Sequence, residues 1–458
     1  MKKQTKQNNN AHKRFKRNAL NAAILFAIFQ SNLQANPNGA QVINGQVSID
    51  TNTPGVMNIT NSPNAIINWQ NFNIQQNEIT RFIQQNSQSA VLNRVMGQNP
   101  SQIMGQLLSN GQVFVINPNG IVFGANSVIN TQGLIASTLN LSNQDFLNGN
   151  YHFTAGSSAG NILNEGIIRA GKDGNIILIA PDIENAQSGI ISTEGGQITL
   201  AAGQELTLTN LDDPDIRFQI QAPDNEVLNL GKVLTKGGAI NLFAGSITHS
   251  GELNANSVHV DEQGNIQLIA LDDITLTINS SISLASSSIL LETTGTADPE
   301  NNSVVFLQGD IDVSGTSGGD VSIQAESLLF SGDIDASGDT AGGSINIELS
   351  KRLLATDDST FDVSTTQGAA GDITISAGER LYTSGNYSAT GEIGGSVDLS
   401  ANEIKLAGAN IDVSGQTIGG SVRVGGGFHG NDSDITNADS TYINGTTIIK
   451  ADAITEGN

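Results

Sequence analysis

From about residue 36 onward, apolar and polar residues alternate in short runs, a pattern that predicts β-strands separated by tight turns. The run QVINGQVSID within residues 41–60 shows the alternation, and residues 65–82 repeat it with larger apolar side chains. The stretch 89–109 lacks this pattern, and we expect it to be partly irregular or helical. Strands dominate the prediction for the rest of the chain.

The alternation becomes repetitive from about residue 161, and the repeat is clearest in the last third of the chain. Each unit reads as a strand, a turn rich in Gly, Ser and Asp, a corner usually made of Gly-Gly, and a second strand. The units begin 23 to 27 residues apart, at Ile311, Ile334, Phe361, Tyr387 and Ile411. A unit this short buries its apolar side chains only by stacking on its neighbours.

This pattern predicts an all-β fold: a right-handed, single-stranded parallel β-helix with an N-terminal cap and extra-helical hairpins. Residues 36–458 would supply roughly 17 rungs at this repeat length. A β-sandwich array would need repeats of about 100 residues. A calcium-binding nonapeptide solenoid would need GGxGxDxUx runs, which GGDVSI at Gly318 and GGSVDL at Gly394 match only loosely. We therefore interpret the Asp residues of the turns as solvated turn formers.

The first 35 residues have the composition of a secretory signal peptide. Seven basic residues precede an apolar run from Ala19 to Phe29, which is too short to span a bilayer as a helix. Leu33-Gln34-Ala35 fits a cleavage site with a small last residue. An N-terminal anchor or a chance apolar run is the alternative. Asn36-Pro37-Asn38-Gly39 follows directly, and because it lacks flanking strands we interpret it as a coincidental turn.

The 458 residues include no Cys and carry a formal net charge of −24. Without the first 35 residues, 13 basic residues would face 44 acidic ones, which gives 13 − 44 = −31. Such a charge argues against binding to nucleic acid or to anionic lipid. The absence of Cys fits a chain that crosses membranes unfolded, although β proteins rich in small residues often lack Cys in any case.

The most informative segment is 92–124, where two short apolar strands, Val113–Ile116 and Ile121–Phe123, flank an Asn-Pro-Asn-Gly turn. Pro118 presets φ for the second position of a turn, Asn119 tolerates the bridge or left-handed region, and Gly120 accepts a positive φ. The chain is therefore expected to turn at a fixed place between two buried strands.

Several motifs follow one another over residues 40–130: INWQNFNI from Ile67, AVLNRV from Ala90, PSQIMG from Pro100, NGQVF from Asn110 and NPNGI from Asn117. In order and spacing they resemble the N-terminal secretion domain of filamentous haemagglutinin-type exoproteins, the passengers of two-partner secretion in Gram-negative bacteria. The resemblance implies a secretion domain over 36–290, with its family-specific core at about 40–130. It also implies a repeat stalk over 291–458 that continues beyond the chain end.

In this family a dedicated outer-membrane transporter with periplasmic domains recognises the secretion domain and passes the unfolded chain, which folds outside. The resemblance therefore implies a secreted or surface-exposed adhesin or haemagglutinin, whose surface ligand is unknown. The implied secretion motif is Asn117, Pro118, Asn119, Gly120 and Ile121. The supporting motif residues are Trp69, Asn71, Phe72, Asn73, Ile74, Asn93 and Arg94. An upstream Asn-Pro-Asn-Leu motif of the family is absent, and residues 71–74 stand in the comparable region.

Two roles stay open for the 117–120 turn. It supports folding of the β-helix cap, so that its loss stops secretion through misfolding, or it contacts the transporter directly. Arg94 lies in a segment with few other charges. We interpret it as a hydrogen-bonding strut for buried carbonyls rather than as a partner-binding residue.

The sequence offers no pattern for catalysis or metal binding. The five His residues, at 12, 152, 249, 259 and 429, lack the paired spacing of a metal site. No GxSxG elbow, P-loop or Cys nucleophile occurs. We therefore expect no enzyme activity, no cofactor and no metal. The alternatives to an adhesin are a passenger for haem scavenging, haemolysis or contact-dependent toxin delivery, and a polysaccharide-degrading enzyme on the same scaffold.

Overall fold

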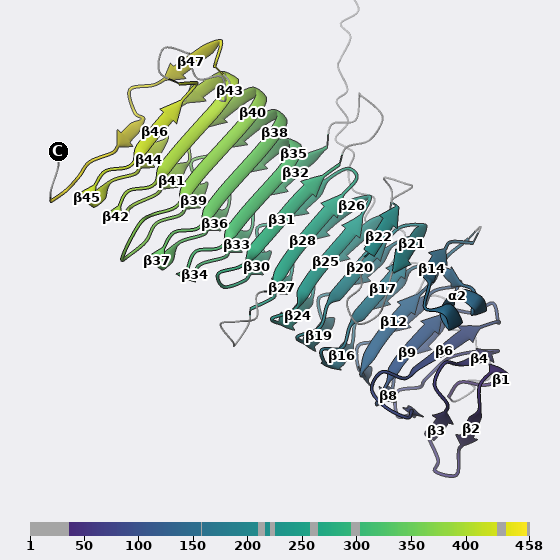
Figure 1. The fold of residues 1–458 in the computed structure, drawn as a ribbon. Coiled ribbons are helices and arrows are strands. Elements are labelled where there is room, and N and C mark those ends of the chain that lie inside the picture. Colours follow the sequence, from purple (N-terminus) through teal and green to yellow (C-terminus); the bar gives the residue numbers. More distant parts are fainter. Residues whose placement is uncertain are drawn as a thin grey trace, which may run out of the picture. The chain divides into compact units, whose positions relative to one another are not determined.

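The computed structural model describes residues 36–156, 158–208, 216–219, 225–256, 264–294, 303–427 and 437–455. The predicted signal peptide lies outside these residues, as do His259 and His429. Residues 35–458 form one compact unit. Its strands stack in parallel from the purple N-terminal end to the yellow C-terminal end (Figure 1), which confirms the predicted parallel β-helix.

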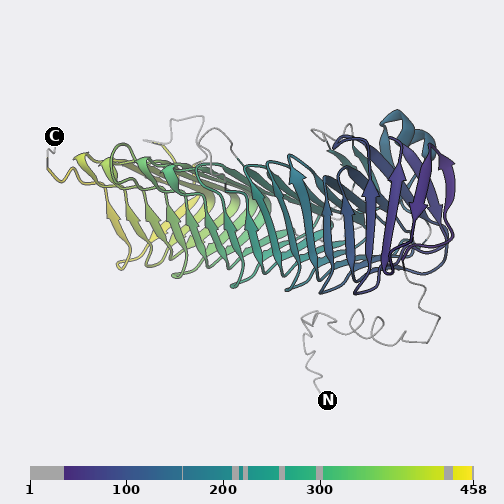
Figure 2. The ribbon, with the colours of Figure 1, turned by 90° about the horizontal axis from the view of Figure 1, so that it is seen from below.

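Most turns of the helix contribute one strand to each of three faces (Figure 2). Face A consists of β4 (Ala65–Trp69), β6 (Ala90–Val95), β9 (Gln112–Ile116), β12 (Gly133–Ser137), β17 (Ile176–Ala180), β20 (Ile198–Ala202), β25 (Ala239–Ala244), β28 (Asn265–Ala270) and β31 (Ser288–Thr293). Face B consists of β7 (Ser101–Ile103), β10 (Ile121–Phe123), β15 (Ile162–Asn164), β18 (Ile183–Asn185), β23 (Glu226–Asn229), β26 (Ser246–His249), β29 (Ile274–Leu276) and β32 (Val304–Leu307).

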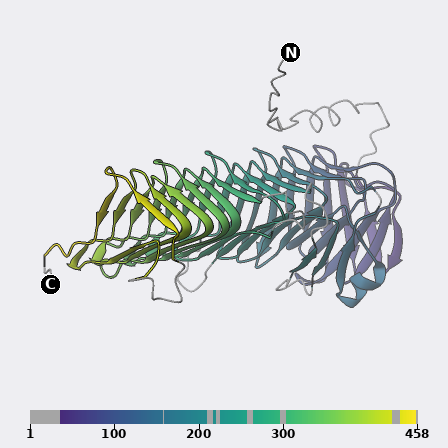
Figure 3. The same cartoon turned by 90° about the horizontal axis from the view of Figure 1, so that it is seen from above.

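Face C is the sheet on the remaining side of the stack, and its labels run along the lower edge in Figure 1. Figure 3 shows the same stack from above. Face C consists of β3 (Val56–Asn61), β5 (Ile79–Ile83), β8 (Gln106–Ser109), β11 (Val128–Thr131), β16 (Ile167–Lys172), β19 (Ile190–Glu194), β24 (Lys232–Lys236), β27 (Glu252–Asn254), β30 (Ser281–Ser283), β33 (Asp310–Asp312), β36 (Asp333–Asp335), β39 (Thr360–Asp362), β41 (Asn386–Ser388), β44 (Asn410–Asp412) and β48 (Ile448–Lys450).

The later repeats differ from the predicted unit in one respect. The second strand and the apolar pair after it are one long strand that serves faces A and B together, because both ends pair with the next turn in register. These strands are β35 (Asp320–Phe330), β38 (Ser344–Ala355), β40 (Asp372–Thr383) and β43 (Ser396–Leu406). Beyond them, β46 (Ser421–Val424) continues face A and β47 (Ser440–Ile443) continues face B. At the corners, β34 (Gly315–Ser317) pairs with β37 (Gly338–Ala341), and β42 (Gly391–Ile393) with β45 (Gly415–Ile418).

The predicted repeat starts lie directly above one another on face C. Ile311 pairs with Ile334, and the ladder continues through Phe361, Tyr387 and Ile411. All five side chains point into the core and are at most 1% exposed. The rings of Phe361 and Tyr387 stack with centroids 4.7 Å apart. Repeats whose first apolar residues coincide in register bury one another, as the stacking argument requires.

An antiparallel cap closes the N-terminal end of the stack. The cap strands are β1 (Gln41–Asn44), which pairs with β4, and β2 (Val47–Asp50), which pairs with β3. The residues before β1 belong to the cap as well, because Asn38 bridges Asn71 and its N–H donates to the Asn71 carbonyl at 3.0 Å. The structure thus gives residues 36–39 a place in the cap, and their interpretation as a coincidental turn stays a prediction. They precede the first strand, so no alternation in the sequence marked them.

A second layer covers the outer side of face A near the cap. It is an antiparallel sheet of β13 (Asn140–Leu141), β14 (Tyr151–Thr154), β21 (Glu205–Leu208) and β22 (Ile216–Gln219), with the short helix α2 (Asn143–Asn148). Its apolar side chains, such as Phe146 and Phe153, form a separate core with outward residues of face A, among them Phe114 and Ile177. These are the extra-helical elements that the fold prediction included.

Two expectations need correction. The stretch 89–109 contains no helix and is mostly strand, because it forms β6, β7 and β8, which short irregular links join. Five of the six residues in β6 are buried, since both sides of this strand are covered, and a strand buried on both sides shows no alternation. Face C among the described residues has 16 strands, of which β2 is antiparallel, so the stack has fewer turns than the roughly 17 rungs expected.

Candidate functional site

The Asn-Pro-Asn-Gly segment forms the corner between faces A and B. Strand β9 ends at Ile116 and β10 begins at Ile121. The Gly120 N–H donates to the Asn117 carbonyl at 3.1 Å, which closes a β-turn, and Gly120 has φ of +120°. A residue with a side chain would be strained at this φ. The predicted turn and its glycine requirement are therefore confirmed.

Asn117 points into the molecule and its side chain is fully buried. Its amide nitrogen donates to the Asn99 carbonyl at 3.0 Å and to the Ser101 hydroxyl at 2.9 Å, both in the preceding turn. Its amide oxygen accepts from the Asn119 backbone N–H at 3.0 Å. The asparagine amide donates and accepts at once here, whereas aspartate lacks the donor and leucine lacks both.

The same corner also binds the turn above it. The Gly160 N–H donates to the Pro118 carbonyl at 2.7 Å, and the Ile121 N–H donates to the Asn161 carbonyl at 3.1 Å. A Cβ at position 160 would lie 2.5 Å from the Asn119 carbonyl oxygen, so only glycine fits. Residues 160 and 161 carry no sequence signal that links them to the motif, because β13, α2 and β14 separate them from it along the chain.

Of the five motif residues, Asn117, Gly120 and Ile121 are buried, and Pro118 and Asn119 are half-buried. The Asn119 side chain turns back along the corner and donates to the Gly97 carbonyl at 2.9 Å. The corner therefore joins three successive turns through hydrogen bonds. Its contact surface for another molecule is limited to the outer edges of Pro118 and Asn119.

The supporting residues lie one and two turns nearer the cap, mostly in the interior. The Trp69 indole N–H donates to the Asn93 side chain at 2.9 Å, and Asn93 donates to the Phe114 carbonyl at 3.1 Å. Trp69 also packs edge-on against Phe72, with ring centroids 5.9 Å apart. Asn73 accepts from the Gln102 backbone N–H at 2.8 Å. The remaining two join neighbouring segments by bridges, Asn71 to Asn38 and Ile74 to Ile103.

Arg94 faces outward from β6, toward the covering layer. Its guanidinium donates to the Asn143 side chain at 2.6 Å and to the Leu141 carbonyl. Burial lowers the pKa of this guanidinium from its ordinary value. The arrangement is that of a strut which fixes β13 and α2 to face A through hydrogen bonds from one side chain.

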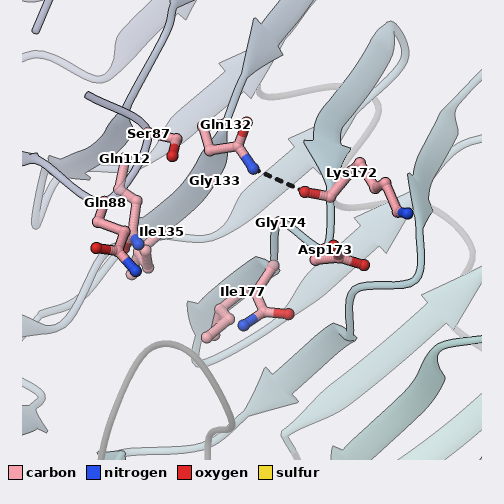
Figure 4. Close-up of a pocket in the computed structure, with 11 residues that line it drawn as sticks. Ser87, Gln88, Gln112, Gln132, Gly133, Ile135, Lys172, Asp173, Gly174 and Ile177 are labelled. Carbon is pink, nitrogen blue, oxygen red and sulfur yellow. Dashed lines mark hydrogen bonds between the residues drawn. The ribbon is translucent and has the colours of Figure 1, made fainter.

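A polar pocket lies at the corner between faces C and A (Figure 4). It is lined by residues including Gln112, Gln132 and Lys172, and Gln132 donates to the Lys172 carbonyl at 2.8 Å. The Asn175 side chain accepts from the Gln197 backbone N–H at 2.7 Å. These amides bond the backbone of neighbouring turns, which is a corner-stabilising role. Within the described residues, no group of three His, Asp or Glu is placed to hold a metal, and no helix is long and apolar enough to cross a membrane.

The family model of the TPS secretion domain matches residues 33–283, which is more than half of the chain and contains the whole motif and the covering layer. The chain belongs to the TPS (two-partner secretion) family. The TPS domain implies that this chain leaves the cell across the outer membrane through a dedicated transporter.

A solved structure and two relatives resemble this TPS protein. The crystal structure of the HMW1 secretion domain from Haemophilus influenzae has a TM-score of 0.68 and 30% sequence identity, and the match covers 89% of this chain and 100% of that one. A heme/hemopexin-binding protein from Haemophilus influenzae is 32% identical over 190 residues, 40% of this chain and 21% of the relative. Another protein of the same name and species is 36% identical over 132 residues, 29% of this chain and 14% of that protein. The matched part is thus about a fifth or less of these relatives' length.

Proposed function

We propose that this TPS protein is secreted by an outer-membrane transporter with periplasmic domains, folds outside the cell as the β-helix, and acts there as a surface adhesin without enzyme activity. The observation that carries the proposal is the family match over residues 33–283, within which the Asn117 corner is built into the stack. Residues 1–35 act as the signal peptide in this proposal. The division into a secretion domain over 36–290 and a stalk over 291–458 belongs to the proposal as well.

The contacts of the corner favour a folding role for the secretion motif. Asn117 and Asn119 direct their amides to backbone carbonyls of the preceding turn. A buried polar group that loses its partner costs about 1–3 kcal/mol. We propose that the motif aligns three turns next to the cap, and that secretion depends on it because the outer part of the chain folds on this end.

This proposal is tested with Asn117→Ala, and with Asn185→Ala as the matched control. Asn185 is also fully buried and bonds the next turn, through Asn229 at 2.8 Å, but it lies away from the motif. Each variant is produced together with the transporter, and its amounts in the medium and in the periplasm are compared. Purified variants are unfolded in urea, and we expect Asn117→Ala to lose about 2 kcal/mol.

The folding role predicts that secretion falls in proportion to lost stability, so Asn185→Ala would reduce it as well if it is equally destabilised. If Asn119→Ala or Asn117→Ala stops secretion at unchanged stability, the motif contacts the transporter directly. Normal secretion of Asn117→Ala would show that the motif is needed neither for folding of the cap nor for contact with the transporter.

Haem scavenging is the second candidate function, and the name of the heme/hemopexin-binding relatives favours it. Purified exported protein is tested for binding to hemin, to hemopexin and to whole host cells. Binding to cells without hemin or hemopexin binding supports the adhesin. Saturable binding of hemopexin, without binding to host cells, would contradict the adhesin function and support haem scavenging.

A further inference from the structure

Asn36, the first described residue, contacts the side chain of Glu78, which lies outside the cap strands. The backbone nitrogen of Asn36 lies 2.8 Å from Oε2 of Glu78 and donates to it. The Gln75 N–H donates to the same oxygen at 2.8 Å. In return, the Thr80 hydroxyl donates to the Asn36 side chain at 3.1 Å. Asn36 is thus held at both its backbone and its side chain.

Glu78 is a buried carboxylate without a cationic side chain beside it. It is 8% exposed, and none of the six ion pairs among the described residues includes it. A buried charge is costly unless it is paired or fully hydrogen-bonded. In the uncleaved chain, the Asn36 and Gln75 groups are neutral amide donors.

The predicted cleavage site lies between Ala35 and Asn36, directly at this contact. Hydrolysis of that peptide bond adds one water, leaves a carboxylate on Ala35 and frees the amine of Asn36. An α-amine is mostly protonated at neutral pH, because its ordinary pKa is about 8. Cleavage also removes the carbonyl that defines φ of Asn36, which is +60° here and lies in the region that non-glycine residues rarely adopt.

We infer that signal-peptide cleavage at Ala35–Asn36 creates the cationic partner of Glu78, and that the resulting α-ammonium–carboxylate pair locks the N-terminal cap. The inference rests on the proposed function, which assigns residues 1–35 as a signal peptide that is removed before the transporter step. A charge-assisted hydrogen bond is about twice as strong as a neutral one. The processed chain therefore holds Asn38 on Asn71, and with it the end of the stack, more firmly than the precursor.

The test compares two forms of residues 36–458, which make up nearly all of the compact unit. One form is released from a ubiquitin-like fusion so that it begins at Asn36. The other carries one extra Gly before Asn36, which restores the amide and moves the ammonium away. Hydrogen exchange is measured at the Gln70 amide, which donates to the Asn38 carbonyl at 2.9 Å and reports cap opening.

We expect about tenfold faster exchange at Gln70 in the Gly-extended form, the difference between a charged and a neutral hydrogen bond. In a Glu78→Gln background the two forms should exchange alike. Equal exchange at Gln70 in the two forms that retain Glu78 would contradict the proposed ion pair. The N-terminus of the exported protein is determined in parallel, and a first residue other than Asn36 overturns the cleavage assignment even if export itself is normal. Loss of export with the Gln70 difference intact speaks against the proposed function alone.

Discussion

At the scale of single residues, buried amides hold the turns of this helix together. Asn164, Asn185 and Asn229 are stacked in register on face B and donate to one another in sequence, each at 2.8 Å. His249 ends this ladder and is fully buried. Asn117 likewise donates hydrogen bonds to a neighbouring turn, at a corner nearer the cap. Side chains that both donate and accept are required wherever the interior must satisfy a carbonyl of a neighbouring turn.

His249 predicts a loss of stability in acid. Its Nε2 lies 3.2 Å from the Ser281 carbonyl and its Nδ1 3.1 Å from the Asn229 amide nitrogen, a pattern that a neutral imidazole satisfies. Burial lowers the pKa of His249 to about 4. The unfolded chain takes up this proton near pH 6.5, so the folded state loses stability as the pH falls from 6.5 to 4.

The shift corresponds to a loss of about 3 kcal/mol, which urea unfolding at several pH values would measure. His249→Asn is the matched variant, because it continues the asparagine ladder and removes the titrating group. We expect its stability to change less over the same pH range. Identical pH profiles for the two proteins would show that His249 is not the group responsible.

At the scale of elements, the covering layer distinguishes the first turns from the later ones. It buries the outer side of face A, so strands such as β17, with the sequence IILIA, are apolar on both sides. The ring of Phe146 packs edge-on against Phe114, with centroids 5.1 Å apart. The layer is thus a second small core, and Arg94 bridges to it with hydrogen bonds.

Arg94→Ala is expected to loosen this layer without unfolding the helix. It leaves the Leu141 carbonyl without the guanidinium donor, at a cost of about 1–3 kcal/mol. Hydrogen exchange should become faster in β13, α2 and β14, while the interior strands stay protected. Arg81→Ala is the control, because Arg81 is exposed and reaches only the Asn58 side chain at 3.4 Å. Equal exchange rates in the covering layer of the two variants would show that Arg94 does not act as a strut.

Elements with one polar side were predictable from the sequence, and elements buried on both sides were not. The repeats from Ile311 to Ile411 could be predicted because one face of each strand is polar and the register repeats. Strand β6 could not, because both of its sides are buried and the alternation disappears. The 117–120 turn was predictable from its own residues, whereas its partners at 160 and 161 follow an excursion whose length the local pattern does not reveal.

At the scale of the molecule, the stack is continuous through the described residues, from the cap to β48. The family model ends at residue 283, and the strands that serve two faces begin at Asp320. The predicted boundary at 290 lies between these positions and stays a prediction. Because neighbouring turns contact mainly one another, folding is expected to spread along the stack from a formed end. The cap and the Asn117 corner lie at the end that the TPS family shares.

In the proposed function, a dedicated transporter exports this chain and the β-helix forms outside the cell. The direct measurement is the amount of protease-resistant protein in the medium of cells that produce the full chain with and without a dedicated outer-membrane transporter. The account predicts folded, resistant protein outside only when the transporter is present. Equal amounts outside without the transporter, or a folded β-helix accumulating in the periplasm while secretion proceeds normally, would contradict it.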